Sequence, residues 1–415
     1  MNIQDLYQQR DNFYIKSSSL TRGGIYLCIL VGLLTFFGGL QLVEQTRVWG
    51  ALLFNLLFFF GLAIGGSALS AMQDVIGANW GRPFMRIHEA FTAFLPVVAV
   101  MLIMFFAAIY FGWGGAENVY TWMNEPEKLS HFFGKRTWLD PMFMFVRDTF
   151  FIVVITWLAY WQMSLKLKRD KILLSGDIQR AEVEGKLIQD KLRHWSGPLL
   201  AAYSIAFTFL GFDLTMSLAW TWFSTLWGGW QFSIVMQTLF ATLLLIMFAL
   251  KGTPIGQMIK RNQFHDCGKM MHGFSVFFAY LTYAHILTYW YGNVPEETEY
   301  FIHRLHAPWI YIVIATPLMA FVFPLFALLP KVSKWTAIMM IPIASIILFA
   351  QWLVALLIVQ PEVVSDKANW MPWVEVGMFF GILGLFMASF FWFSQRFPMI
   401  SIADPLLLEA YNDDH

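Results

Sequence analysis

The sequence is poor in charge and in cysteine, and both shortages narrow its class. Only 13% of the 415 residues are charged and 58% are hydrophobic, with a mean hydropathy of +0.58. Soluble domains average about 25% charged residues, so the composition indicates a membrane protein. The formal net charge is zero, which gives no indication of a nucleic-acid partner. The two cysteines form no CxxC or CxxCH motif, so no disulfide framework, zinc knuckle or covalently attached haem is signalled.

Long apolar runs fill most of the chain. Each is long enough to cross a hydrocarbon layer of about 30 Å, and Trp and Tyr cluster at the run ends, where amphipathic rings prefer the interface. We therefore predict an all-α polytopic membrane protein with about ten transmembrane helices. The expected spans are residues 23–43, 49–72, 84–113, 141–165, 196–222, 227–250, 266–291, 307–329, 335–359 and 372–395.

The basic residues are distributed unequally over the two sides. An even number of spans places both termini on one side, where 20 Lys and Arg residues fall, against 6 on the opposite side. The positive-inside rule then predicts cytoplasmic termini. The expected division is an N-terminal tail (1–22), a membrane domain (23–395) and a C-terminal tail (396–415). The cytoplasmic loop within that domain, 166–195, has mixed charge at helical spacing and is read as a solvated amphipathic hairpin.

Ionisable residues inside the spans form two layers. Such groups are costly in hydrocarbon and are usually kept for a function or a partner. We expect Glu89, Lys269 and His272 in an inner proton half-channel, and Asp148, Asp213 and His285 in an outer one. Neutral groups, Ser204, Thr208, Gln237, Ser275 and Tyr280, lie between the layers. The candidate proton-path residues are His88, Glu89, Arg147, Asp148, Asp213, Lys269, His272 and His285. The alternative for each is structural: a long side chain reaching the headgroups, or a structural ion pair.

Two histidines on one span raise the question of haem. His272 and His285 are thirteen residues apart, a spacing typical of b-type cytochrome helices. A rise of 1.5 Å per residue separates them by about 20 Å, so they cannot ligate one haem together. A two-haem site needs a second helix with the same spacing, and the sequence has none. We therefore expect no cofactor in this chain.

Several segments, in order, resemble the ActF-type subunits of alternative complex III, a branch of the NrfD/PsrC-like membrane-anchor superfamily. The segments are GANWGRPFMRIHEAF, GGAENVYTW, FFGKRTWLDPMFMFVRD, FDLTMSLAWTWFSTLWGGW, DCGKMMHGFSVFFAYLTYAHILTYWYGNVPEET and ADPLLLEAY. The segment YFGWGGAENVY replaces the HLGRP-like element usual in the sister ActC subunit, which favours ActF. The family would carry glutamine where this chain has His285.

The resemblance implies two four-helix bundles with flanking helices in a bacterial inner membrane. It implies a cofactor-free, non-catalytic subunit of a quinol:electron-acceptor oxidoreductase in a respiratory or photosynthetic electron transport chain. Its partners would be a multihaem cytochrome c, an iron–sulfur subunit, an ActC-like membrane subunit and a terminal oxidase, with membrane lipids around it. In the family the quinol site is ascribed to ActC and a proton path to ActF.

Three alternatives stay open. The chain could be the quinone-binding anchor of a molybdopterin/iron–sulfur oxidoreductase, with quinol near Asp148, Asp213 and His285. It could be a stand-alone proton-coupled transporter, although it lacks paired Gly/Pro-broken spans in corresponding halves. It could also be a purely structural scaffold.

Overall fold

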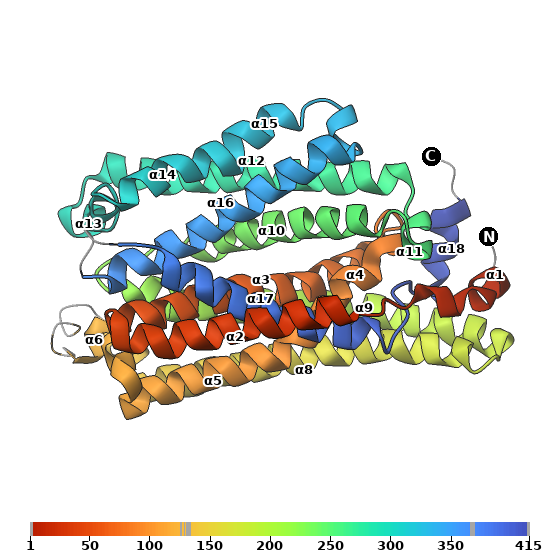
Figure 1. The fold of residues 1–415 in the computed structure, drawn as a ribbon, viewed down its shortest axis with the longest axis horizontal. Helices are drawn as coiled ribbons and strands as arrows, with labels where there is room; N and C mark the ends of the chain where they lie inside the picture. The colour runs from red at the N-terminus through yellow and green to blue at the C-terminus, as the bar shows by residue number, and fades with distance from the viewer. Residues whose placement is uncertain (1–2, 125–126, 128, 130–133, 366–369, 413–415) are drawn as a thin grey trace.

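The computed structural model describes residues 3–124, 127, 129, 134–365 and 370–412. The described chain is helical without strands, and its long helices run roughly parallel (Figure 1). Within it nine helical stretches are long and apolar enough to cross a membrane. They are α2 (Ser19–Leu42), α3 (Gln45–Ile76), η2 to α5 (Arg82–Phe111), α8 (Pro141–Leu174), α9 to η6 (Ile178–Leu218), α10 (Trp227–Leu250), α14 to α15 (Trp309–Ala327), α16 (Ala337–Val363) and α17 (Trp373–Ser394). The chain is an all-α polytopic membrane protein.

A tenth long helix, α12 (Arg261–Gly292), runs the length of the molecule beside the others (Figure 1). It is less apolar because its first turns carry charge and its body carries histidine and tyrosine. The first helix of the described chain, α1 (Ile3–Gln8), and the last, α18 (Pro405–Asn412), lie at the same end of the molecule (Figure 1). We call this the terminal end and the other the distal end.

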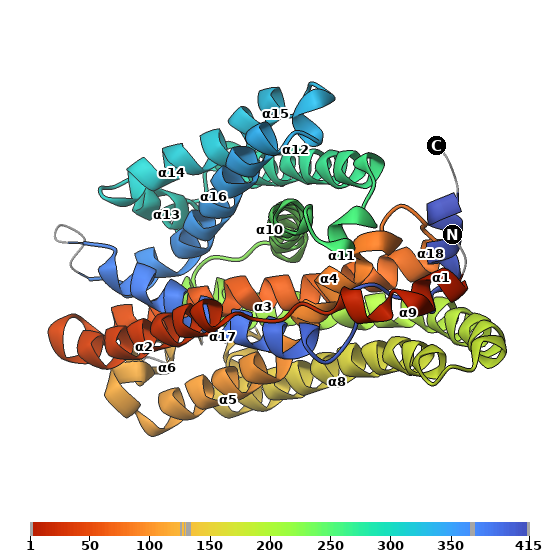
Figure 2. The same ribbon diagram turned by 45° about the vertical axis from the view of Figure 1, so that its right-hand side comes forward.

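The helices form two four-helix bundles and a flanking pair, as the fold class predicted. The first bundle consists of α3, the η2–α5 segment, α8 and α9; the second consists of α10, α12, α14–α15 and α16. In Figure 2 the second bundle lies above the first, with α10 facing both. The flanking helices α2 and α17 pack together and against α3, which is buried along nearly all its length.

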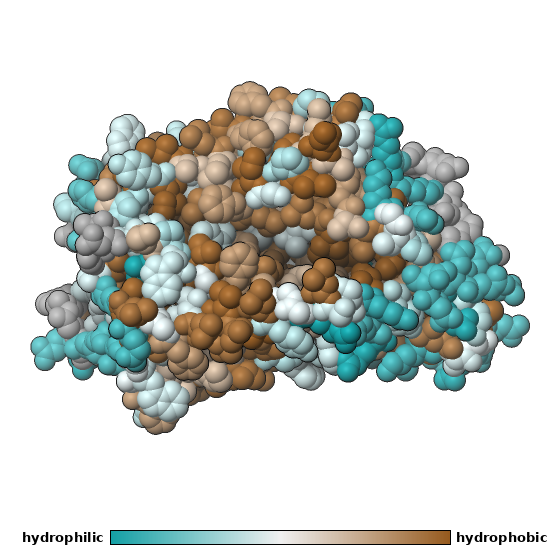
Figure 3. Space-filling view, in the orientation of Figure 1, coloured by the Kyte–Doolittle hydropathy of each residue, from teal (hydrophilic) through white to brown (hydrophobic). Residues whose placement is uncertain are grey.

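The flanking pair depends on a contact between glycines. A Cβ atom on Gly32 of α2 would lie only 2.3 Å from the Cα of Gly381 of α17. Small residues let helix backbones approach closely in a membrane, where packing replaces the hydrophobic effect as the driving force. On the face shown in Figure 3, apolar side chains form a broad band across the middle of the molecule, between more polar ends. Such a band is what a bilayer requires.

A proline-broken helix is repaired by side chains from its own bundle. The stretch α14–α15 includes a π-helical turn, Leu318–Val322, just before Pro324. Proline has no N–H, so the carbonyl of Ala320 loses its helical donor. Gln237 Nε2 and Ser275 Oγ donate to that oxygen instead, at 2.7 and 2.5 Å. Two of the predicted neutral middle residues therefore hold the second bundle together.

The α8–α9 hairpin differs from the expectation of a fully solvated loop. Helix α8 continues to Leu174 and α9 begins at Ile178, so each helix is longer than a bilayer needs: 34 residues at 1.5 Å rise make about 51 Å for α8. The hairpin extends at the terminal end, and one of its faces is buried against the bundle. The physical reason is that its buried charges have partners there, described below.

The two tails also pack onto the terminal end. Met399 N donates to Phe13 O (2.7 Å), and Ile15 N donates to Ser394 O (3.1 Å). Met399 and Phe13 are fully buried. Beyond this contact the chain turns into α18 (Pro405–Asn412), and Asp404 directly before it enters a buried ionic network.

Candidate functional site

Eight charged side chains meet inside the terminal end of the first bundle, and we call them the terminal network. Each is at most 2% exposed. The cations come from the η2–α4 segment and from α8, and the anions come from α3, α4 (Met85–Glu89), α8 and the C-terminal segment. Four cations face four anions. The members are Arg82, Arg86, Lys166, Arg169, Asp74, Glu89, Asp170 and Asp404.

Arg82 and Arg169 hold the C-terminal segment onto the bundle. Arg82 Nη1 lies 2.8 Å from Asp74 Oδ1 and 3.3 Å from Asp404 Oδ2. Arg169 Nη2 lies 2.8 Å from the same Asp404 oxygen, and its Nη1 donates to Gln189 Oε1 at 2.8 Å. Because Asp404 has two cationic partners, the chain between α17 and α18 is fixed by charge as well as by burial.

Lys166 and Arg86 hold Glu89. Lys166 Nζ lies 2.7 Å from Glu89 Oε1 and 2.7 Å from Asp74 Oδ2. Arg86 Nη1 lies 3.1 Å from Glu89 Oε2, and its Nη2 is bonded to Asp170. Glu89 therefore has two cationic partners, neither of which is the Lys269 that the sequence suggested.

The local sequence explains why these charges converge. Residues 166, 169 and 170 follow an i, i+3, i+4 pattern and so share one face of α8. Arg82, Arg86 and Glu89 follow the same kind of spacing through η2 (Arg82–Phe84) and α4. A buried charge is tolerated only when it is paired and hydrogen-bonded, and the two faces supply each other's partners.

His88 lies beside the network and forms no ion pair with the described residues. It is fully buried, and its Nδ1 lies 2.9 Å from the carbonyl oxygen of Gly66 on α3. A Cβ on Gly66 would be 2.3 Å from His88 O, so glycine is required for this close approach. Since a carbonyl only accepts, Nδ1 carries the proton. His88 is placed to fix α4 against α3.

Asp404 lies outside the membrane-spanning segments, and its ionisation is controlled by its partners. Burial by itself would raise the pKa of this carboxyl, but Arg169, Arg82 and Lys166 together hold its pKa well below the usual range. Asp404 is therefore a carboxylate at every physiological pH. The tail contact is ionic throughout that range.

A polar line leads from Glu89 toward the middle of the bundle. Ser70 Oγ donates to Glu89 Oε1 at 2.8 Å, and a cavity of about 10 Å³ adjoins both. That is close to the space one water molecule needs. The cavity is also lined by Ser67, Thr92 and Gln162. It offers a water-sized space next to a buried carboxylate.

The line continues through Tyr203. Its hydroxyl lies 3.4 Å from Gln162 Oε1, and the same residue lines a second cavity of about 330 Å³ between α3, α9 and α10. Ser204 and Thr208 add hydroxyl groups to that cavity. These two were among the neutral residues expected in the middle. Tyr280, also expected there, is 64% exposed on α12 and does not face the interior.

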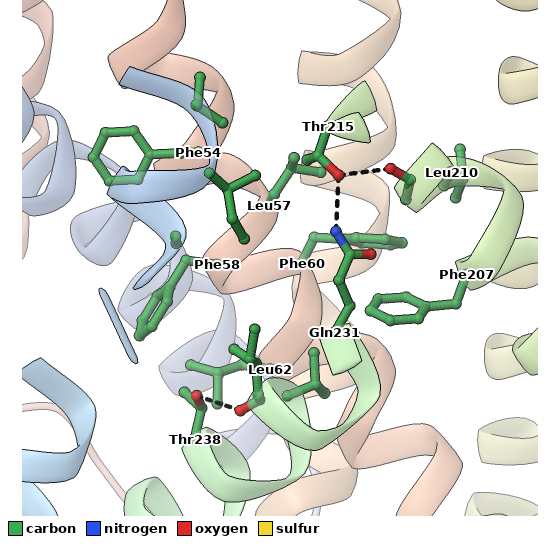
Figure 4. A pocket seen from close by; sticks show the side chains of 16 residues that line it. Phe54, Leu57, Phe58, Phe60, Leu62, Phe207, Leu210, Thr215, Gln231 and Thr238 are labelled. Carbon is green, nitrogen blue, oxygen red and sulfur yellow. Dashed lines mark hydrogen bonds between the residues drawn. The ribbon is translucent and has the colours of Figure 1, made fainter. Parts of the chain in front are cut away.

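Beyond this cavity the interior becomes largely apolar. Figure 4 shows the next pocket, of about 70 Å³, where apolar side chains such as Phe54, Leu57 and Phe60 outnumber the polar ones. Gln231 Nε2 donates to Thr215 Oγ1 at 2.8 Å, and Thr215 Oγ1 donates to Gly211 O at 2.6 Å. At this depth the lining of the pocket is therefore largely apolar.

A group of two acids and one cation lies in the distal half of the first bundle, and we call it the distal group. Arg147 Nε and Nη2 donate to Asp213 Oδ2 at 3.0 and 2.7 Å, and Trp138 Nε1 donates to Asp213 Oδ1 at 2.8 Å. Asp148 is fully buried and interacts electrostatically with Asp213. Among the described residues neither of its carboxyl oxygens has a hydrogen-bond donor. The distal group is thus not charge-balanced.

Three of the predicted residues lie apart from these sites. Lys269 is 56% exposed and pairs with Asp266 at 2.7 Å, so it is not a partner of Glu89. His272, on the same helix of the second bundle, is partly exposed. His285 is surrounded by Trp222, Trp227 and Trp230 rather than by Asp148 and Asp213. The expected grouping was wrong for these three because α12 belongs to the second bundle and the acids belong to the first.

Of the eight members of the terminal network, sequence reasoning named only Glu89 as a candidate site residue. Lys166, Arg169 and Asp170 were assigned to a solvated loop, and Asp404 to a tail. Helical spacing on α8 could have indicated a common face, but spacing cannot show whether water or protein covers that face. The partner of that face, Asp404, is 234 residues or more away along the sequence.

The fold and these buried groups define a polytopic helical membrane protein with ionisable side chains at two depths of one bundle. The chain matches no model of a known protein family, and no curated protein matches it.

Proposed function

We propose that the chain is the membrane-embedded subunit of a quinol:electron-acceptor oxidoreductase of the alternative complex III type, and that it conducts protons there. Its redox partners in this proposal are a multihaem cytochrome c, an iron–sulfur subunit and a second membrane subunit of the ActC type. Two features support this assignment: the sequence segments quoted above, which follow one another in the same order as in that family, and the two-bundle fold. The basic terminal end faces the cytoplasm in this proposal.

One observation carries the proton-conducting role. The first bundle has a buried carboxyl group near each end. The polar line, which consists of hydroxyl groups, an amide group and two cavities, spans part of the distance between them. The line runs from Glu89 through Gln162 and Tyr203 to Thr208. Thr208 is five residues from Asp213 on α9, or about 7.5 Å along the axis. A scaffold has no need of this line.

The distal group supplies a site that can exchange a proton. The group has two carboxyls and one cation, Arg147, which pairs with Asp213, so it is neutral when the two carboxyls hold one proton between them. Two like charges in a low-dielectric interior repel, which favours that singly protonated state. Asp213 keeps the Arg147 bond, so the exchangeable proton is assigned to Asp148. Loss and gain of this proton change the charge of the group by one.

At the terminal end Glu89 is the exchanging group. Its carboxylate borders the water-sized cavity, and Lys166 and Ser70 hold it in place. When Glu89 binds a proton, its ion pair with Lys166 is broken, and Lys166 keeps its ion pair with Asp74. Transfer onward uses the hydroxyl of Tyr203 and water in the larger cavity. The apolar segment around Thr215 is where the path must open during turnover.

The assignment to a complex is tested by purification. The tagged chain, extracted in mild detergent, is expected to bring with it haem-containing and iron–sulfur subunits. A molybdopterin subunit instead would indicate the quinone-binding anchor of a different oxidoreductase. A chain that purifies alone and transports protons would indicate the stand-alone transporter.

The proton path is tested in proteoliposomes that contain the purified complex. Asp148→Asn and Glu89→Gln keep size and hydrogen bonding but remove an exchangeable charge. Each is expected to lower proton release per quinol oxidised while quinol oxidation itself is little changed. Tyr280→Phe, on the exposed face of α12, is the matched control. Unchanged proton release in both acid variants would contradict the path, and loss of assembly would show that the charges are structural.

A further inference from the structure

Two stretches of chain at the terminal end of the second bundle carry an excess of positive charge. Residues 251–269, which lead into α12, contain four Lys and Arg residues and one acid, Asp266. Residues 328–337, between α15 (Phe323–Ala327) and α16, contain two lysines and no acid. The short helix η8 (Val332–Lys334) in the second stretch packs against both α12 and α16. The proton path proposed above uses none of these residues.

The two stretches meet at Trp335, which follows Lys334 in the chain. The guanidinium carbon of Arg261 lies 3.7 Å from the centre of the Trp335 ring, which is a cation–π contact. A Cβ atom on Gly268 of α12 would lie only 3.0 Å from the Cβ of Lys334, so Lys334 packs beside the residue that precedes Lys269. Cations from two distant parts of the sequence therefore lie close together.

Lys331 belongs to the same group of cations. It lies one 3₁₀ turn before Lys334, whose backbone N–H donates to Lys331 O at 3.2 Å, and side chains three residues apart on such a turn point the same way. His265 on α12 interacts electrostatically with Lys269, Lys331 and Lys334. We call the group the basic corner, and its members are Arg261, Lys269, Lys331 and Lys334.

The basic corner has fewer anions than cations. Lys269 pairs with Asp266 at 2.7 Å, whereas Arg261, Lys331 and Lys334 form no ion pair with any residue that the structure describes. The corner therefore carries an unbalanced positive charge, the opposite of the distal group. An anion from outside the chain would be attracted to it.

Lys334 shows that the missing anion is not replaced by water alone. Its side chain is only 7% exposed, and its ammonium group donates to the carbonyl oxygen of Leu328 at the end of α15. The partial negative charge of helix carbonyls stabilises a cation but does not neutralise it. A buried cation is normally paired with an anion, so Lys334 adds to the demand for one.

The basic corner borders the apolar surface that faces lipid. Leu329, Val332 and Ile338, which flank the two lysines in the sequence, are each more than half exposed. Exposed apolar side chains next to basic ones and a tryptophan are typical of the level where acyl chains end and headgroups begin. A ligand with an anionic head and apolar tails would contact both kinds of surface.

A phosphodiester headgroup has the chemistry that this corner lacks. Arginine and lysine donate charge-assisted hydrogen bonds to phosphate oxygens, and basic pockets between membrane helices recognise anionic headgroups. A zwitterionic headgroup carries its own ammonium group, which the unbalanced cations repel. The corner should therefore discriminate in favour of lipids with a net negative charge.

We propose that the basic corner binds the headgroup of an anionic phospholipid. Arg261 and Lys331, both exposed, contact the phosphate, while Lys269 and Lys334 add positive potential behind them. The acyl chains lie along the exposed apolar side chains at 329, 332 and 338. The site requires only that the chain spans a membrane, so it can fail or hold independently of the proposed proton path and redox partners.

The test is a competition between two lipids for the protein purified in mild detergent. Dioleoyl phosphatidylglycerol has a net negative charge, and dioleoyl phosphatidylcholine has the same tails but is zwitterionic. Both are added at equal concentration, and native mass spectrometry measures the amount of each that stays bound. Phosphatidylglycerol is expected to bind at least about tenfold more tightly, because each basic residue contributes a factor of about five. Equal binding of the two lipids would overturn the proposal.

Variants locate the site. Arg261→Gln combined with Lys331→Gln is expected to lower the preference for phosphatidylglycerol by about tenfold or more and to leave phosphatidylcholine binding unchanged. Arg180→Gln combined with Lys186→Gln, on the exposed start of α9, removes the same charge elsewhere at the terminal end and is the matched control. Unchanged preference in the first double variant, or equal losses in both, would overturn the proposal.

Two further measurements exclude other causes. Arg261→Lys combined with Lys331→Arg keeps both charges and is expected to retain most of the preference, and a complete loss here would contradict recognition by charge. Sodium phosphate and sodium chloride at equal ionic strength are expected to displace phosphatidylglycerol equally, because they only screen the charges. Stronger displacement by phosphate would show a site for free phosphate instead of a lipid and would overturn the proposal.

Discussion

The terminal network and the distal group differ in the balance of their buried charges. In the terminal network four cations meet four anions, and every carboxylate lies within ion-pair distance of a cation. In the distal group Arg147 pairs with Asp213, and Asp148 beside them has no hydrogen-bond donor among the described residues. Both are buried in the same bundle, so the difference lies in charge balance and not in depth.

This difference in charge balance distinguishes a structural ion network from a group that can exchange a proton. A balanced buried network holds elements together, because removing any member leaves a charge uncompensated. An unbalanced group reaches neutrality only by binding a proton, so it can release one at moderate cost. Glu89 belongs to the balanced network but borders a water-sized cavity. Glu89 therefore combines the ion pairs of a structural network with a neighbouring space for the water that proton exchange requires.

The largest expected effect comes from breaking the balance at the terminal end. Arg86→Met leaves Glu89 with one cation and deprives Asp170 of its closest one. An uncompensated buried charge costs about 3–5 kcal/mol, so we expect a large loss of folded protein and of resistance to denaturant in detergent. Thermal unfolding followed by tryptophan fluorescence measures it.

A second variant checks that charge balance is the cause. Arg86→Met combined with Asp170→Asn removes one charge of each sign and should recover part of the lost stability. If the double variant is less stable than Arg86→Met alone, specific geometry rather than balance controls the network.

The distal group is expected to respond asymmetrically. Asp213→Asn deprives Arg147 of its carboxylate and should lower the free energy of unfolding by about 1–3 kcal/mol. Asp148→Asn replaces an acid that has no donor with a neutral isostere, so its cost should be below about 1 kcal/mol. The two variants are compared by chemical denaturation in the same detergent. Equal losses would show that Asp148 is also a structural anion.

Acid should loosen the C-terminal segment. The folded-state pKa of Asp404 lies below its unfolded value of about 4, so its stabilising contribution is complete above that pH. That contribution is lost as the pH falls below about 4 toward the folded-state pKa. The stability difference between the wild type and Asp404→Asn should therefore be constant from pH 7 to 5 and shrink below pH 4. Limited proteolysis of the C-terminus across this range measures it, and a pH-independent difference would contradict the ionic role.

The smallest effect is expected at Lys269. Its partner Asp266 is also partly exposed, and such pairs contribute less than about 1 kcal/mol. Lys269→Met should change neither unfolding nor proton release. A loss of proton release comparable to that of Glu89→Gln would restore the original grouping of Lys269 with the proton path.

The all-α membrane class and nine of the ten expected spans could be predicted from the sequence, because a helix in lipid must be long and apolar. The tenth expected span, 266–291, coincides with the long helix α12, which is less apolar than the other nine. The extent of α8 and α9 was not predicted, since helices that leave the bilayer carry no hydropathy signal. The positive-inside bias stays a prediction; two of the basic residues in that count, Lys128 and Lys367, lie outside the described residues.

By itself the sequence determined that Glu89, Asp148 and Asp213 lie within the membrane helices, because their cost in hydrocarbon makes them conspicuous against 58% hydrophobic residues. Only the tertiary structure decided how they pair. Glu89 meets Lys166 across 77 residues and Arg82 meets Asp404 across 322. His285, which depth alone grouped with the acids, lies instead in an aromatic cavity of the other bundle. Depth follows from position along one helix, whereas pairing follows from the neighbours that packing brings to each face, and no single helix contains that information.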